Sequence, residues 1–335
     1  MTMIPGLVST IIPVFNRPTL LREAVACVLE QTHRPIEIIV VDDGSTDNTP
    51  DVCRELQELH QGTLHVIRQE NRGPGLAREA GRQAVSGEFI QYLDSDDWIH
   101  PRKFERQVNL LRRDVGCGVS YCKTRETDAK GQEWNGAASV RTGEALETLF
   151  PSLLSGRCWQ TVTPLIRREV SDRAGSWADL GQEEDWEYDS RIALLGTKLS
   201  WCPEFLADYR SHSGPRAGGG SLADRKKMLW RVQAHVLIYR HAKAAGITAD
   251  DEHMCRYARE LFLLARQCGA MGLSVQSREL FDLARDASGP LRGTRWEFRL
   301  YRLATSILGW TLSGRLSDWV DRWRRTPIPS GEVAT

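Results

Sequence analysis

The stretch Tyr92-Leu93-Asp94-Ser95-Asp96-Asp97 decides the fold of this chain, because an apolar run ends abruptly in three carboxylates. The residues from Ile90 to Leu93 are typical of the end of a buried strand, and the acids begin where a parallel strand would leave its sheet. Open α/β folds bind their ligands at that edge. We therefore expect these acids to hold a ligand at the end of a central strand.

A cation is the ligand that this acidic cluster favours. Neighbouring carboxylates repel one another unless a hard, oxygen-preferring ion such as Mg²⁺ or Mn²⁺ neutralises them, and such ions usually join protein acids to substrate phosphates. The same residues also fit a capped turn, in which Asp94 or Asp96 accepts backbone N–H groups before the helix that Pro101 opens. The stretch alone leaves both interpretations open.

Two earlier segments repeat the order of strand, polar loop and helix. Residues 36–41 are a β-branched apolar run with strand character, and they stop at Asp42-Asp43-Gly44-Ser45, which is turn and cap chemistry. Residues 7–15 form another strand, followed by Asn16-Arg17-Pro18 and an amphipathic helix. Two strands therefore end in acids at what we expect to be one edge of a sheet.

With these segments in place, the chain resembles the inverting glycosyltransferases of family two. The resemblance covers roughly residues 5 to 215 and implies an α/β domain of the GT-A type, a Rossmann-like open mixed sheet flanked by helices. Five pieces carry it, in the order in which the family has them: Ser9 to Arg17, Val41 to Asp47, Asn71 to Arg78, Gly87 to Asp97, and Glu183 to Tyr188.

The resemblance assigns donor-binding roles to several of these residues. It implies that Asp43 accepts a hydrogen bond from a uracil ring, with Pro13 and Phe15 in the base pocket, so that the donor is a UDP-sugar. An Asx turn at Asp43 is the structural alternative, although Asp42 could fill that role instead. Arg78 matches a basic residue near the donor, or it is simply a solvated arginine.

The Asp-x-Asp pair matches the metal-binding motif of the family. The resemblance implies that Asp94 contacts the ribose and the metal, and that Asp96 binds the Mn²⁺ or Mg²⁺ ion on the donor diphosphate. Such an ion stabilises the negative charge that develops on the leaving group. His212 falls where some relatives offer a histidine to the metal or diphosphate, but a lone loop histidine usually does neither.

Inverting transfer also needs a base that removes the proton from the acceptor hydroxyl. The family places an aspartate for this purpose in a Glu-Asp pair at the start of a helix, and Glu184-Asp185 matches that pair. The resemblance therefore implies that Asp185 is the catalytic base. An acidic helix start, which the macrodipole favours, is the alternative.

Composition limits the other possibilities. The 335 residues carry 44 Lys and Arg against 44 Asp and Glu, so the overall charge gives no indication of nucleic acid as a partner. The eight cysteines are scattered without a C-x-x-C pair, which is typical of reduced thiols in the cytoplasm. The N-terminus lacks signal-peptide features. We therefore expect a cytoplasmic protein.

The C-terminal part has a different character. We expect a GT-A domain over 1–215, a glycine-rich loop or linker over 216–224 and a helical region over 225–335. An amphipathic helix near the end could lie on the anionic inner face of the membrane or pack on its own domain. Its apolar stripe consists of Trp296, Leu300, Leu303, Ile307 and Trp310. Its basic stripe consists of Arg292, Arg295, Arg299 and Arg302. Further along the chain, Trp319, Trp323 and the arginines at 322, 324 and 325 would reinforce both stripes.

The predicted function is therefore a metal-dependent inverting glycosyltransferase. It would move a sugar from a UDP-sugar to a hydroxyl of a glycan or a lipid-linked acceptor, in the synthesis of a polysaccharide or another part of the cell envelope. Two alternatives stay open. A non-catalytic nucleotide-binding scaffold would use the same domain, and a nucleotidyltransferase would need a basic phosphate loop that residues 13–17 do not supply. The sequence does not indicate an oligomeric state.

Overall fold

A computed structural model describes residues 3–128, 132–211 and 224–325. The described chain forms two compact units, one from Met1 to Gly220 and one from Ser221 to Thr335. His212 and the predicted glycine-rich segment, except for Asp224, lie outside the described residues.

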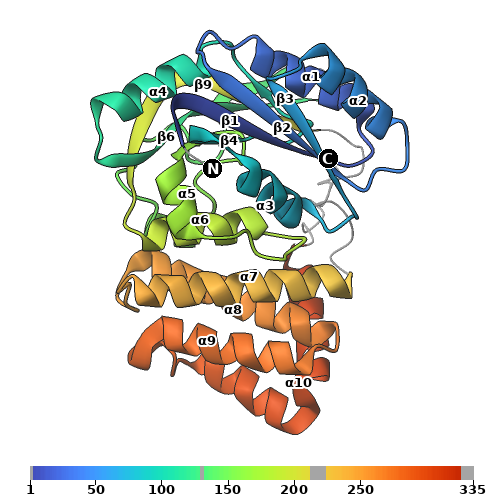
Figure 1. Ribbon diagram of the computed structural model, residues 1–335. Helices are drawn as coiled ribbons and strands as arrows, with labels where there is room; N and C mark the ends of the chain where they lie inside the picture. Colours follow the sequence, from blue (N-terminus) through green and yellow to red (C-terminus); the bar gives the residue numbers. More distant parts are fainter. Residues whose placement is uncertain (1–2, 129–131, 212–223, 326–335) are drawn as a thin grey trace, which may run out of the picture. The chain divides into compact units, whose positions relative to one another are not determined.

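The first unit is built on a nine-stranded mixed sheet with helices on both faces (Figure 1). The strand order is β3-β2-β1-β4-β8-β6-β9-β5, and β7 pairs with β6. The strands β1, β2, β3 and β4 are parallel, whereas β8 runs antiparallel to both β4 and β6. The strands are β1 (Ile4–Val14), β2 (Ile36–Asp43), β3 (Leu64–Gln69), β4 (Gly87–Tyr92), β5 (Trp98–Ile99), β6 (Cys117–Asp128), β7 (Glu133–Ala138), β8 (Leu165–Arg167) and β9 (Lys198–Ser211).

Two helical layers cover the sheet. The helices α1, α2 and α4 lie on one face, and α3, α5 and α6 lie on the other (Figure 1). The predicted GT-A-like fold, an open mixed sheet flanked by helices, is confirmed. The helices of this unit are α1 (Pro18–Leu29), α2 (Thr49–Leu59), α3 (Pro74–Ala84), α4 (Lys103–Arg113), η1 (Ser152–Ser155), α5 (Arg168–Ala174) and α6 (Glu184–Leu194).

The central strands are apolar on both sides because both faces are covered. Every residue of β2 is buried, as expected of a parallel strand between two helical layers. In β1, Ile12 belongs to the core under α1, α2 and α4, whereas its neighbour Ile11 points to the opposite face and meets α3.

The contact between α3 and β1 depends on a glycine. A Cβ atom placed on Gly81 would lie 2.4 Å from Cγ2 of Ile11, which is closer than carbon atoms can pack. The absence of a side chain therefore lets α3 approach the sheet, and this approach places Arg78, one turn earlier on the same helix, against the end of β4.

The second unit is helical, as predicted. It consists of α7 (Arg225–Ala244), α8 (Glu252–Ala270), α9 (Ser274–Arg292) and α10 (Trp296–Arg325). Asp224 and Asp251 cap α7 and α8, since each carboxylate accepts two backbone N–H groups of the first helical turn. Within the described residues, no helix is long and apolar enough to cross a bilayer.

Two members of the predicted C-terminal stripes lie elsewhere in the structure. Arg292 ends α9, where its guanidinium donates to the carbonyl oxygen of Ala249 at 3.1 Å, so it does not extend the basic stripe of α10. The helix kinks at Gly309, which has φ 75°, and Trp310 beyond the kink packs against Phe281. The exposed apolar stripe therefore stops at Ile307. The side chains of Trp319, Trp323 and Arg322, Arg324 and Arg325 lie outside the described part of the chain.

The close approach at Gly81 predicts a specific thermodynamic coupling. Gly81→Ala should lower the free energy of unfolding by about 1 to 3 kcal/mol, because the new methyl group overlaps Ile11. Adding Ile11→Ala makes room for that methyl group, so the pair should be less destabilising than the sum of the single variants. Denaturant unfolding of the four proteins measures the coupling, and additive losses would show that Ile11 is not the obstacle.

Candidate active site

The parallel strands bring the motif residues to one edge of the sheet. Val14 pairs with Asp42 at the ends of β1 and β2, and Ile11 pairs with Tyr92 at the end of β4. The carboxyl ends of the three strands therefore lie side by side. Asp43 and the acids that follow Tyr92 stand at this edge, as the sequence predicts.

Asp43 is 4% exposed and holds the loop between β3 and α3. Its Oδ1 accepts the backbone N–H of Arg72 at 2.9 Å and the side-chain amide of Gln69 at 2.7 Å, and its Oδ2 accepts the N–H of Gly73 at 2.8 Å. The local turn is instead held by Asp42, whose Oδ1 accepts the N–H of Ser45 at 3.0 Å. The Asx-turn interpretation of Asp43 is therefore wrong.

Beside Asp43, the end of β1 offers an apolar surface. Pro13 is buried in the strand, whereas Phe15 follows the strand and is 44% exposed. Asn16 turns the chain here with φ 52°, and its Oδ1 accepts the N–H of Thr46 at 2.8 Å. The end of β1 is thereby tied to the loop that follows β2, and an exposed aromatic ring stands at the sheet edge.

Arg78 connects the two acidic motifs. Its Nη2 donates to Oδ1 of Asp94 at 2.6 Å, and its Nη1 donates to Oε1 of Glu184 at 2.7 Å. The guanidinium carbon also lies 5.0 Å from the ring centroid of Trp177, within cation–π range. Arg78 is 3% exposed, so the alternative of a solvated arginine is wrong.

The charge of this buried arginine is secured by its partners. Burial by itself lowers the pKa of Arg78, but the carboxylates of Asp94, Glu184 and Asp185 outweigh it and raise the pKa above the usual value. Burial together with Asp185 raises the pKa of Glu184. A permanent cation therefore lies between the end of β4 and the start of α6, and its contact with Glu184 joins residues 106 positions apart in the sequence.

Asp96 and Asp97 differ in their surroundings. Asp96 forms an ion pair with Arg17, whose Nη1 lies 2.7 Å from its Oδ2. Asp97 is turned into the protein, where its Oδ1 accepts the N–H of Arg210 on β9 at 3.1 Å. Burial, with Asp96 and Asp94 nearby, raises the pKa of Asp97 well above the usual aspartate value. Asp97 therefore has a structural role in joining β9 to this loop.

The donor set at the end of β4 fits a hard divalent ion. Asp94 and Asp96 supply carboxylate oxygens, which Mg²⁺ and Mn²⁺ prefer, and their mutual repulsion favours a cation. Among the described residues, no three His, Cys, Asp or Glu side chains converge as a complete site. An ion of the Mg²⁺ kind takes one or two protein carboxylates and completes its shell with water and substrate phosphates.

Asp185 lies in the first turn of α6 and is partly exposed. Its Oδ2 forms an ion pair with Arg157 at 2.5 Å and accepts the hydroxyl of Thr161 at 3.2 Å. The carboxylate therefore already accepts an O–H donor, which is the kind of group that a sugar acceptor would present.

A second acid lies one helical turn further along α6. Burial raises the pKa of Asp189 to about 8, although Arg157 acts in the opposite direction. The protonated form of Asp189 is therefore favoured more strongly than in an exposed aspartate. Burial lowers the pKa of Arg157, but Asp185, Asp189 and Glu184 outweigh this effect and raise it, so the guanidinium stays charged.

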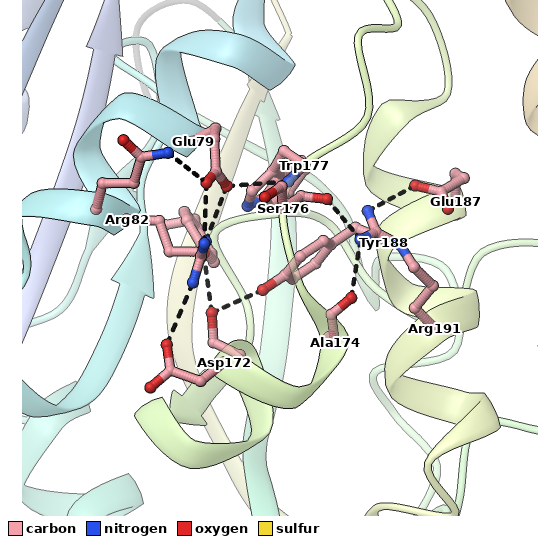
Figure 2. Close-up of polar contacts among 12 residues, drawn as sticks. Glu79, Arg82, Asp172, Ala174, Ser176, Trp177, Glu187, Tyr188 and Arg191 are labelled. Carbon is pink, nitrogen blue, oxygen red and sulfur yellow. Dashed lines mark hydrogen bonds and ion pairs between the residues drawn. The ribbon is translucent and has the colours of Figure 1, made fainter.

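A polar network behind the site fixes α3, α5 and α6 to one another (Figure 2). Glu79 accepts two hydrogen bonds from Arg82, at 2.8 and 2.9 Å, and one from the backbone N–H of Trp177 at 3.0 Å. Arg191 on α6 donates to Glu187 at 2.8 Å and to the carbonyl of Ala174 at 2.9 Å. The network holds the Trp177 ring against Arg78 and orients the helix that begins with Glu184.

Sequence reasoning missed the arginines that pair with these acids. Arg17 lies inside a family motif, at the end of a strand predicted to reach the same sheet edge as the Asp-x-Asp pair, and this position was the signal for its contact with Asp96. Arg157 has no motif around it, and only the fold brings it to Asp185. Trp159 follows Arg157 closely in sequence but belongs to the core, because its side chain is 1% exposed and packs against Tyr121.

Comparisons with known proteins agree with this geometry. A family model described as glycosyl transferase family 2 matches residues 9–166. An uncharacterized glycosyltransferase of Nostoc sp. is 42% identical over 61% of this chain and 65% of its own length. The uncharacterized glycosyltransferase EpsJ of Bacillus subtilis is 25% identical over 93% of this chain and 94% of its own.

The fold has a solved counterpart. The structure of S. aureus TarS 1-349 in complex with UDP-GlcNAc superposes with a TM-score of 0.66 at 17% identity, covering 96% of this chain and 93% of that one. This likeness extends over both units and concerns the fold. Residues 9–166, which include most of the motif residues at the edge of the sheet, match the glycosyl transferase family 2 model, and the chain is similar to curated glycosyltransferases.

Proposed function

We propose that this protein is a metal-dependent inverting glycosyltransferase that transfers a sugar from a UDP-sugar to a hydroxyl group of a glycan or a lipid-linked glycan. The observation that carries the proposal is the contact of Arg78 with both Asp94 and Glu184. It joins the residues proposed to bind the donor diphosphate to the residue pair proposed to supply the base. Donor and acceptor chemistry thereby meet at one edge of the sheet.

The donor base would bind at the ends of β1 and β2. Asp43 would accept the imide N–H of uracil, and Phe15 would lie against the ring, with Pro13 forming the wall of the pocket. The network that fixes Asp43 supports this role, because three N–H donors hold its carboxylate in place. The UDP-GlcNAc complex of TarS supports a UDP-linked donor.

A Mn²⁺ or Mg²⁺ ion would be held by Asp94 and Asp96, and His212 is a further candidate ligand. When bound, the ion would neutralise charge on the diphosphate. The ion pair between Arg17 and Asp96 would break when Asp96 binds the ion, and the Arg17 guanidinium could then bind the donor phosphates. Arg78 would keep Asp94 in position throughout.

Asp185 would act as the general base. The acceptor hydroxyl would lie where the hydroxyl of Thr161 now donates to Oδ2, and its proton would pass to this carboxylate. The acceptor oxygen would form a bond to the anomeric carbon while the bond from that carbon to the diphosphate breaks on the opposite face. The products are then UDP and the glycosylated acceptor, with inverted configuration.

The biological setting that fits these substrates is the synthesis of cell-envelope or other polysaccharides in the cytoplasm, where nucleotide sugars are made. Mass spectrometry of products after incubation with a panel of nucleotide sugars and acceptors tests the reaction class directly. If the protein neither transfers nor slowly hydrolyses any donor, the scaffold interpretation replaces the enzyme.

If Asp96 binds the metal, its substitution should affect only the part of UDP binding that depends on Mn²⁺. Asp96→Asn should abolish the part of UDP affinity that depends on Mn²⁺, because the amide is a poor ligand for a hard cation. Asp43→Ala should weaken UDP binding about 10-fold or more with and without Mn²⁺, since it removes an acceptor from the base pocket. Calorimetry with both variants decides, and an unchanged Mn²⁺ effect in Asp96→Asn would refute the assignment.

The ion pair between Arg17 and Asp96 predicts that loss of the arginine raises the affinity for Mn²⁺. Arg17→Met removes a cation from Asp96, so Mn²⁺ should bind several-fold more tightly in the absence of nucleotide. Arg22→Met is a matched control five residues later, in α1, because Arg22 pairs with Glu55 and should leave Mn²⁺ binding unchanged. Metal titration by electron paramagnetic resonance measures both. Equal affinities in wild type and Arg17→Met would show that Arg17 does not compete with the ion.

The base is tested by Asp185→Asn, which is nearly isosteric and cannot take a proton. Transfer should fall by roughly 10² to 10⁴-fold while UDP affinity is retained. Thermal unfolding is measured in parallel, because the variant leaves Arg157 with less compensating charge.

Asp189→Asn provides a matched control for this experiment. It makes the same substitution one turn later on α6, in a carboxyl group that is 6% exposed and whose pKa burial raises, so transfer should persist. Wild-type turnover in Asp185→Asn would exclude Asp185 as the base. Absence of transfer and donor hydrolysis in the wild type and in both variants, with UDP still bound, would favour the scaffold.

A further inference from the structure

The first part of α10, from Trp296 to the kink at Gly309, has two apolar faces. One face packs inside the helical unit. Phe298 lies 4.9 Å from the ring of Phe262, and Tyr301 lies 5.7 Å from Phe281, both measured between ring centroids. Tyr301 and Thr305 are buried on this face. The helix therefore already covers the core of its own unit.

The second apolar face points away from that core. Trp296, Leu300, Leu303 and Ile307 are 66%, 55%, 56% and 71% exposed. At 100° per residue these four side chains fall within an arc of about 60°, roughly opposite Thr305. Packing within the unit does not explain them, and contiguous exposed apolar side chains of this kind mark an interaction surface.

Positive charge lies along one edge of this face. Between Gly293 and Gly309 the basic residues are Arg295, Arg299 and Arg302, and all three are exposed. Glu297 is the one acidic residue in the same span of sequence. The three arginines flank the apolar stripe on the same side, which is the arrangement by which an in-plane helix places cations among anionic headgroups.

Lipid accounts for this surface better than a second copy of the chain. From Trp296 to Ile307 the stripe is about 17 Å long and one side chain wide. A stable protein interface buries roughly 800 Å² on each partner, and these four side chains alone do not supply that area, although Leu308, Leu312 and Leu316 are exposed further along α10. Two copies would also bring their arginines together, whereas an anionic bilayer complements their charge.

We propose that the stripe Trp296, Leu300, Leu303 and Ile307 inserts into the surface of an anionic lipid bilayer, with Arg295, Arg299 and Arg302 among the headgroups. The proposal concerns membrane attachment and is independent of the transfer reaction. It specifies a peripheral contact by one helical face. The acyl boundary would receive the apolar side chains and the phosphate groups would receive the guanidinium groups.

The test uses the full chain and vesicles of phosphatidylcholine with or without 30% phosphatidylglycerol. Co-sedimentation should be strong with the anionic vesicles and weak with the neutral ones, and it should fall as salt is raised. Leu303→Ser combined with Ile307→Ser should lower the partition coefficient about 10-fold or more. Deletion of the whole helix is a poor test, because it would uncover the rings of Phe262 and Phe281.

Two further variants make the result specific. Val275→Ser removes a similarly exposed aliphatic side chain from α9 and should leave co-sedimentation unchanged. Arg295→Gln, Arg299→Gln and Arg302→Gln together should remove most of the preference for phosphatidylglycerol. Equal co-sedimentation of the wild type and the Leu303→Ser, Ile307→Ser variant would overturn the proposal. A concentration-dependent dimer that these two serines dissolve, without lipid binding, would assign the stripe to a second copy instead.

Discussion

The structure of the candidate active site depends on one buried guanidinium group. Arg78 donates to Asp94 after β4 and to Glu184 at the start of α6, and a buried arginine needs such partners because an unpaired charge in the interior is costly. Gly81 allows α3 to approach β1 closely enough for this contact, and the network around Glu79 holds the Trp177 ring against the cation. The distance between donor-side and base-side residues is therefore set by packing that lies behind the site.

The acids of the site share one electrostatic arrangement. Asp94 pairs with Arg78, Asp96 with Arg17 and Asp185 with Arg157, so each carboxylate proposed to bind the metal or to act as the base has an arginine as its partner. These pairs compensate the repulsion between carboxylates that the sequence shows. A nucleotide diphosphate and a divalent ion would bring their own opposite charges, and the arginines could then pair with phosphate oxygens, which their geometry suits.

The helical unit adds a surface of a different kind. Its aromatic core uses one face of α10, and the exposed apolar stripe on the opposite face has no role in that core. Asp224 and Asp251 fix the starts of α7 and α8, because each carboxylate accepts backbone N–H groups of the helix that follows it. A glycosyltransferase acting on a lipid-linked acceptor would benefit from attachment to a membrane.

Local sequence determined the strands, the loops and the identity of the acids. The apolar runs before Asp43 and Asp94 predicted parallel strands that end at one edge of the sheet, and the structure has them there. The prediction was possible because strand patterns and turn residues depend on neighbouring positions in the sequence. The pairing of Asp185 with Arg157, the contacts of Asp43 with the backbone of Arg72 and Gly73, and the burial of Trp159 were decided by the tertiary structure. So was the end of the exposed stripe at Ile307, where the kink at Gly309 turns Trp310 onto Phe281. These features depend on contacts between residues far apart in the chain. A local sequence pattern does not specify which distant side chain will pack against a given residue.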